Sequence, residues 1–181
     1  MEAAKIKRTG DGLSVLLAGL QAGMLGVLWM LAWMGFSAGL QRRSFWTPEN
    51  LMATTFYDGG GIGRGFSGRT LSGLALYILV YAILGAVFAI TVRGRFSRGR
   101  LVLVGLVAAL AWYYLSFHGI WKAVSPLVAL LHPERPTIFG HVIYGFILAR
   151  FPRYLPELPP EPAPPVPAPA NVSESEPPLT P

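Results

Sequence analysis

The sequence predicts an all-α integral membrane protein built as a four-helix bundle, and three observations support this prediction. Only 13% of the 181 residues are charged, 52% are hydrophobic, and the mean hydropathy is +0.47, whereas a soluble domain carries about 25% charged residues. The stretches 13–40, 71–92 and 101–121 contain no charged residue. Each is long enough for a helix that crosses a hydrocarbon core, which takes about 20 residues. The sequence shows no strand pattern.

The predicted spans form one transmembrane domain at 13–155, which follows a basic segment at 1–12. The spans are expected at about 13–40, 70–92, 101–121 and 137–151. The first is longer than a bilayer is thick and should tilt or protrude, and Ser67 or Thr70 can cap the second. The fourth has only 15 residues. We expect it to span because Arg150 and the nearby Arg153 can extend their long side chains to the interface.

Two connecting segments are expected to form short helices at the membrane interface. In FWTPENLMATTFYDGGG, Thr47, Pro48 and Glu49 supply an N-cap, a first-turn proline and a first-turn acid. A helix at about 48–57 should therefore lie in the interface. In KAVSPLVALLHPERP, prolines begin and end an apolar segment that is too short to span.

The distribution of positive charge predicts the orientation. With the N-terminus inside, nine Lys and Arg residues fall on the inner side and six on the outer side, and four of the inner arginines lie in the link 93–100. Cytoplasmic loops carry the excess of positive charge. Both termini are therefore expected in the cytoplasm.

The segment 156–181 is predicted to be a disordered, proline-rich tail. It holds 11 prolines in 26 residues and no aromatic side chain, so it lacks the apolar surface for a packed core. A solvated tail is the simpler interpretation, and a docking segment for a proline-binding partner is the alternative.

Residues 63–70, GRGFSGRT, match a phosphate-binding loop except that Arg69 replaces the lysine. Such a loop needs a preceding strand and an acidic residue that holds magnesium, and the sequence offers neither. A glycine-rich turn whose Arg64 and Arg69 meet lipid headgroups explains the same residues. Neither a nucleotide nor a nucleic acid is expected as a partner.

No acidic residue lies within an apolar stretch. Proton-driven transporters need a titratable carboxylate inside the membrane, so the sequence disfavours that class. The chain also has no cysteine, which excludes disulfides and thiolate metal sites.

Small residues within the spans predict faces where helices approach closely in lipid. They are Gly19, Gly23 and Gly26 in the first span, Ala82 and Ala86 in the second, and Gly105 and Ala109 in the third. An intramolecular bundle is the simpler interpretation, and a homo-oligomer or a larger membrane complex is the alternative.

Three histidines, His118, His132 and His141, are expected near the outer face, where imidazoles can bind haem or a metal. No two of them have ligand spacing on one helix, and Glu134 is the one carboxylate near enough to orient them. The alternatives are interfacial hydrogen bonding for His118 and His132 and helix packing for His141. No catalytic residue, no cofactor and no dedicated metal site is predicted.

The segments RSFWTPENLMATTFY and FGHVIYG resemble those of small uncharacterised four-helix inner-membrane proteins of bacteria, over about 13–151. The resemblance implies the bacterial inner membrane and transfers no residue role. The sequence therefore favours a non-enzymatic accessory or scaffold protein that contacts the lipid bilayer and other proteins. The alternative is a small redox protein that binds haem or a metal through the three histidines.

Overall fold

The computed structural model describes residues 11–156, and all regular structure in this range is helical, which confirms the predicted all-α fold. The long helices are α1 (Gly12–Leu40), α3 (Gly68–Val92), α4 (Arg98–Leu115) and α7 (Glu134–Leu148). The short helices are α2 (Thr47–Met52), α5 (Trp121–Val124) and α6 (Pro126–Leu131), and four single-turn elements join them, η1 (Ala53–Thr55), η2 (Gly59–Gly61), the π-helical η3 (Ser116–Ile120) and η4 (Phe151–Tyr154). Nearly all of the predicted tail and of the basic segment lies outside the described residues.

Three helical segments are long and apolar enough to cross a membrane. They are α1, α3 and the continuous helix Arg98–Val124, which comprises α4, η3 and α5. This finding supports the prediction of an integral membrane protein. The helix α7 is not among the three; it has 15 residues, and both of its ends lie three residues earlier than the sequence predicts.

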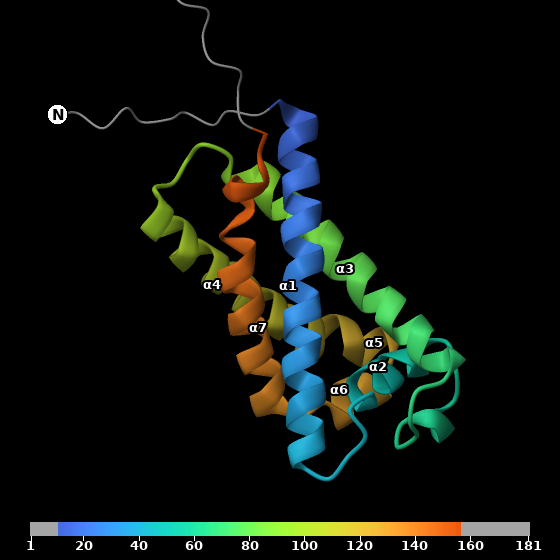
Figure 1. Ribbon diagram of the computed structural model, residues 1–181. Coiled ribbons are helices and arrows are strands. Elements are labelled where there is room, and N and C mark those ends of the chain that lie inside the picture. Colours follow the sequence, from blue (N-terminus) through green and yellow to red (C-terminus); the bar gives the residue numbers. More distant parts are fainter. Residues whose placement is uncertain (1–10, 157–181) are drawn as a thin grey trace, which may run out of the picture.

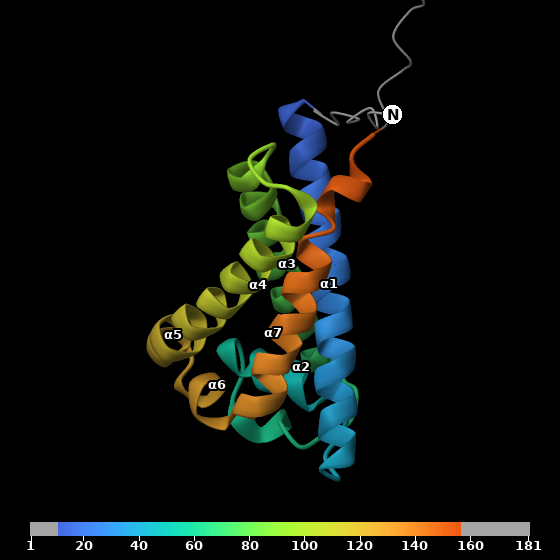
Figure 2. The ribbon, with the colours of Figure 1, turned by 90° about the vertical axis from the view of Figure 1, so that its left-hand side faces the viewer.

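The long helices pack as a row in the order α3, α1, α7, α4, and α3 makes little contact with α4. Figure 1 shows α1 as the central helix, crossed by α3 on one side and accompanied by α7 on the other. Figure 2 shows α4 leaning away from α1 along its length. The short helices α2, α5 and α6 gather in the half of the molecule farthest from the N-terminus (Figures 1 and 2).

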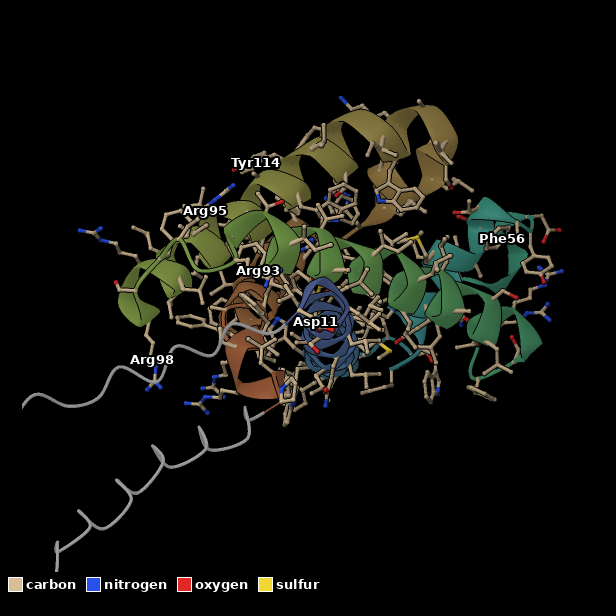
Figure 3. All side chains as sticks on the ribbon, turned by 90° about the horizontal axis from the view of Figure 1, so that it is seen from above. Asp11, Phe56, Arg93, Arg95, Arg98 and Tyr114 are labelled. Atoms are coloured by element: carbon tan, nitrogen blue, oxygen red, sulfur yellow. The ribbon has the colours of Figure 1, made fainter. Side chains whose placement is uncertain are left out.

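Figure 3 views the molecule from the end at which α1 begins. Asp11 is the N-cap of α1, and its Oδ1 accepts a hydrogen bond from the backbone N–H of Ser14 at 2.8 Å. Arg98 extends away from the bundle in this view, whereas Arg95 donates to the carbonyl oxygen of Thr91 at the end of α3 at 2.7 Å. At the opposite end of the molecule, Ser67 is the N-cap of α3. It is one of the two caps that the sequence allows.

The seam between α1 and α3 is built from residues without side chains or with a single methyl group. A β carbon added at Gly19 would lie 2.6 Å from the carbonyl oxygen of Gly85, and one at Gly23 would lie 2.5 Å from that of Tyr81. Ala82 and Ala86 lie against the same two glycines. The absence of side chains lets the two helix backbones touch, which is the packing that replaces the hydrophobic effect in lipid.

The seam between α4 and α7 uses the same device. A β carbon at Gly105 would lie 2.7 Å from the carbonyl oxygen of Gly145, and one at Gly145 would lie 3.1 Å from Cβ of Ala109. Gly26 of α1 faces Tyr144 of α7, whose Cδ2 would be 2.7 Å from an added β carbon. The small residues singled out in the sequence thus all lie between helices of one chain.

The helix α2 is shorter than the sequence predicts and is packed inside the protein. It ends at Met52 instead of continuing to 57, and every residue from Pro48 to Ala53 is buried. The reason is Gly73 of α3, where a β carbon would overlap the carbonyl oxygen of Glu49. Because Gly73 has no side chain, α2 packs into the bundle at this point.

Candidate functional site

A group of tyrosine and histidine side chains is buried where α3, α4 and α7 face one another. His141 has no exposed surface, and its Nε2 lies 2.7 Å from the hydroxyl of Tyr81. Its Nδ1 lies 2.7 Å from the carbonyl oxygen of Thr137. Since a carbonyl oxygen only accepts, Nδ1 donates to it, and Nε2 of the neutral ring accepts from Tyr81. Both ring nitrogens of His141 are therefore engaged.

Two more tyrosines enclose this pair. The hydroxyl of Tyr144 donates to the carbonyl oxygen of Tyr81 at 2.7 Å, and the two rings meet edge to face at 4.9 Å. The ring of Tyr113 lies 5.3 Å from that of His141, and both Tyr113 and Tyr144 are fully buried. We call Tyr81, Tyr113, His141 and Tyr144 the polar centre.

His132 adjoins the polar centre from the segment after α6. Its Nε2 accepts from the Tyr113 hydroxyl at 3.4 Å, and its Nδ1 donates to the carbonyl oxygen of Ala129 at 2.8 Å. Its ring stacks on Phe117 with centroids 4.2 Å apart. Phe117 belongs to η3, a π-helical turn that changes the register of the helix, and such turns are frequent at functional sites.

The third histidine adjoins the same group from its exposed side, since the ring of His118 lies 6.0 Å from that of Tyr113, which also neighbours His132 and His141. His118 is exposed and stacks on Tyr114 at 5.5 Å, and Figure 3 shows Tyr114 on the outer side of α4. Among residues 11–156, no group of three or more His, Cys, Asp or Glu is arranged to hold a metal ion. A ligand to His132 or His141 through Nε2 would have to displace a tyrosine hydroxyl.

The loop that resembles a phosphate-binding motif is held by contacts within the protein. Arg69 forms an ion pair with Asp58 and stacks over Tyr57 with its Cζ 5.3 Å from the ring centre. Thr70 donates to Oδ1 of Asn50 at 2.7 Å, and Asn50 in turn donates from Nδ2 to the carbonyl oxygen of Arg64 at 2.9 Å. Asn50 thereby fastens α2 to this loop and to the start of α3.

Next to Asn50, α2 carries a buried acid. Glu49 is only 2% exposed, and its Oε2 has no hydrogen-bond partner among the described residues. Burial raises the pKa of the Glu49 carboxyl from its ordinary value of 4.5 to about 7, against the weaker effect of its own backbone N–H. A search of the apolar stretches for a carboxylate overlooks Glu49 because α2 is not a spanning segment. The packing of α2 against α3 nevertheless buries this acid in the interior.

The raised pKa predicts that the protein loses stability as the pH rises from about 4.5 to about 7. The folded state binds the proton more tightly than the unfolded state, so the stabilisation is complete below 4.5 and is lost as the pH passes the folded value. The free energy of unfolding should fall by about 3 kcal/mol across this window. Detergent unfolding followed by circular dichroism measures it, and in Glu49→Gln the decline should disappear. An equal decline in both proteins would contradict the prediction.

A cavity of about 480 Å³ lies beside α2, beyond the end of α1. Its walls are mainly apolar, and its polar lining includes Tyr77, His132 and the two arginines that follow α1. The apolar side chains are Met34, Ala38, Pro48, Leu51, Ile62, Leu131 and Pro133. Arg42 and Arg43 bring two positive charges to a space of the size that small ligands occupy.

The backbone at Arg42 is held in an unusual conformation. Its φ is 58°, and it is the one residue other than glycine with a positive φ between 11 and 156. The N–H groups of Arg42 and Arg43 donate to the carbonyls of Gly39 and Ala38 at 3.0 and 2.9 Å. This is a Schellman ending of α1, in which glycine is the usual residue at the position of Arg42. An arginine there costs about 1 kcal/mol relative to glycine.

We compared the chain with protein-family models, curated proteins and solved structures, and no significant match was found in any of the three.

Most residues of the site carry no strong signal in the sequence. Tyr81, Tyr113 and Tyr144 are uncharged, so a search for ionisable groups within spans passes over them. The spacing of His141 and Tyr144, one helical turn apart, was the available clue, because it puts two polar side chains on one face of α7. In the sequence, Arg42 is only one of the six positive charges that are expected on the outer side.

Proposed function

We propose that the protein is a non-enzymatic, multi-pass protein of the bacterial inner membrane that binds an anionic lipid in the cavity beside α2. The observation that carries the proposal is Arg42, an arginine in a glycine conformation at an apolar cavity. Backbone strain of this kind concentrates at functional sites. An apolar wall with guanidinium groups beside it is complementary to an acyl chain joined to a phosphate.

The predicted orientation places the cavity on the outer side of the membrane. With the N-terminus inside, the link 93–100 lies on the cytoplasmic side, and the cavity lies at the other end of α1. In this proposal α7 is the fourth span, because it packs along both α1 and α4. In this proposal, lipid binding is the activity of the accessory or scaffold protein.

The redox alternative has less support. Nε2 of His141 and Nε2 of His132 each accept a hydrogen bond from a tyrosine hydroxyl, and His118 is exposed and meets the group through the ring of Tyr113. A haem or metal bound to these histidines would give a reducible optical band or a stoichiometric metal in the purified protein. That spectrum is the test of the alternative.

The lipid proposal is tested by native mass spectrometry of the detergent-purified protein with lysophosphatidylglycerol and lysophosphatidylcholine. The anionic lipid is expected to bind preferentially, and glycerol phosphate without an acyl chain is expected not to compete. Arg43→Gln should weaken binding by about tenfold, the effect of one lost charge-assisted hydrogen bond. Arg98→Gln is the matched control and should bind normally. It removes an exposed arginine at the end of the molecule opposite the cavity.

Arg42→Gly separates function from stability. Glycine adopts the required φ without strain, so this variant should be more stable than the wild type by about 1 kcal/mol. It should nevertheless lose about tenfold in affinity for the anionic lipid. A variant that is stabilised and binds normally would overturn the proposal.

A further inference from the structure

The buried acid Glu49 and the cavity share one neighbour. Tyr77 of α3 lines the cavity, and it lies one helical turn after Gly73, the position at which α3 touches the backbone of Glu49. Pro48 and Leu51, which flank Glu49 in α2, line the same cavity. An anion in the cavity would therefore lie against the same helix that carries Glu49.

The surroundings of Glu49 contain no partner that could neutralise its charge. From α3, the titratable neighbour is Tyr77, while Arg69 is turned toward Asp58 in an ion pair. From α1, η1, η2 and α6, no ionisable side chain is presented, since these elements contain none. The charged or titratable residues just outside them are Arg42 and Arg43 after α1, Asp58 before η2, Arg64 after η2 and His132 after α6, and no ion pair joins any of them to Glu49 in the described part of the chain.

We propose that Glu49 is a proton-binding site linked to the cavity, so that the protein takes up a proton at Glu49 when an anionic lipid binds. The inference rests on the proposed lipid binding. Its physical basis is that a second negative charge beside a buried carboxylate disfavours the ionised form. By linkage, the same interaction makes lipid binding favour the protonated protein.

The orphaned Oε2 agrees with this assignment. A buried carboxylate that has no cation beside it, and only its own backbone N–H as a donor, is costly, whereas the protonated acid carries no net charge. The neutral form is therefore the one that the packed position of α2 accommodates. A bound lipid keeps Glu49 in that form at a pH where it would otherwise ionise.

The experiment measures the affinity of the full-length, detergent-purified protein for lysophosphatidylglycerol from about pH 6 to about pH 8. The phosphodiester of this lipid does not titrate in that range, so the pH dependence reports on the protein. The wild type should bind up to about tenfold more weakly at the higher pH. In Glu49→Gln, binding should persist and the pH dependence should vanish.

A second measurement does not depend on a variant that folds. Addition of the lipid to the wild type in weakly buffered solution should cause net proton uptake, read with a pH indicator, and lysophosphatidylcholine should cause none.

Binding without pH dependence and without proton uptake would overturn the link between Glu49 and the cavity and leave the proposed function intact. The same pH dependence in Glu49→Gln would assign the proton to another group. No binding at any pH would overturn the proposed function itself, whereas the pH-dependent stability of the lipid-free protein tests the raised pKa of Glu49 separately.

Discussion

Gly85→Ala is expected to destabilise the protein by about 1–3 kcal/mol, although alanine is the better helix former by about 1 kcal/mol. A β carbon at Gly85 would overlap the carbonyl oxygen of Gly19 and lie 2.8 Å from the Cα of Gly23. Both contacts are with backbone atoms, which cannot rotate away as a side chain can. The helices α1 and α3 would have to separate, and separation loses the packing along the whole seam.

Gly39→Ala is the control for this prediction. Gly39 lies in α1 as well, but no atom is within 4 Å of the position of its β carbon. Its substitution should leave the stability unchanged or slightly increased. Unfolding by dodecyl sulfate in mixed micelles, followed by circular dichroism, compares the two variants. If both substitutions are neutral, α1 and α3 do not meet at Gly85.

Tyr81→Phe is expected to cost about 1–3 kcal/mol because it leaves Nε2 of His141 buried without its donor. The phenylalanine keeps the ring, so the edge-to-face contact with Tyr144 survives. The loss therefore reports the partners of the Tyr81 hydroxyl, which are His141 and the side chain of Trp112. His141→Leu, which removes the other partner, should be destabilising for the same reason.

The double variant Tyr81→Phe/His141→Leu distinguishes a hydrogen bond from general disruption. With both polar groups gone, no unpaired atom is left between them, so the combined cost should be clearly smaller than the sum of the two single costs. Tyr114→Phe is the control, since Tyr114 is 57% exposed, and it should change the stability by less than about 0.5 kcal/mol. Additive costs would mean that Tyr81 and His141 act independently.

The fold class was predictable because it depends on local properties. Three apolar segments without charge define helices that can span, and small residues at helical spacing indicate where the helices can touch. Ser67 could be identified as a cap of α3 because capping depends on the residues of one turn. These properties can be read within a window of some 20 residues.

The candidate site was not predictable in the same way because its residues meet across the fold. Tyr81 and His141 are 60 residues apart, and no local pattern indicates that they form a hydrogen bond. From the sequence, Glu49 is expected to be the first-turn acid of a surface helix. Its burial depends on the missing side chain of Gly73 in α3, which lets α2 approach closely. The strain at Arg42 depends on the residue at which α1 ends, and the ends of helices are the least certain part of a sequence-based assignment.

The open row of helices has a consequence for how this sequence can change over evolutionary time. In the 18-residue apolar window of each segment, 50% of α1 is buried but only 33% of Arg98–Val124 is. A position that faces acyl chains requires only an apolar side chain, because a lipid adjusts its shape to whichever one it meets. A position between two helices requires a particular volume. Substitutions should therefore accumulate fastest along the outer face of α4 and slowest along α1, which has a neighbour on each side.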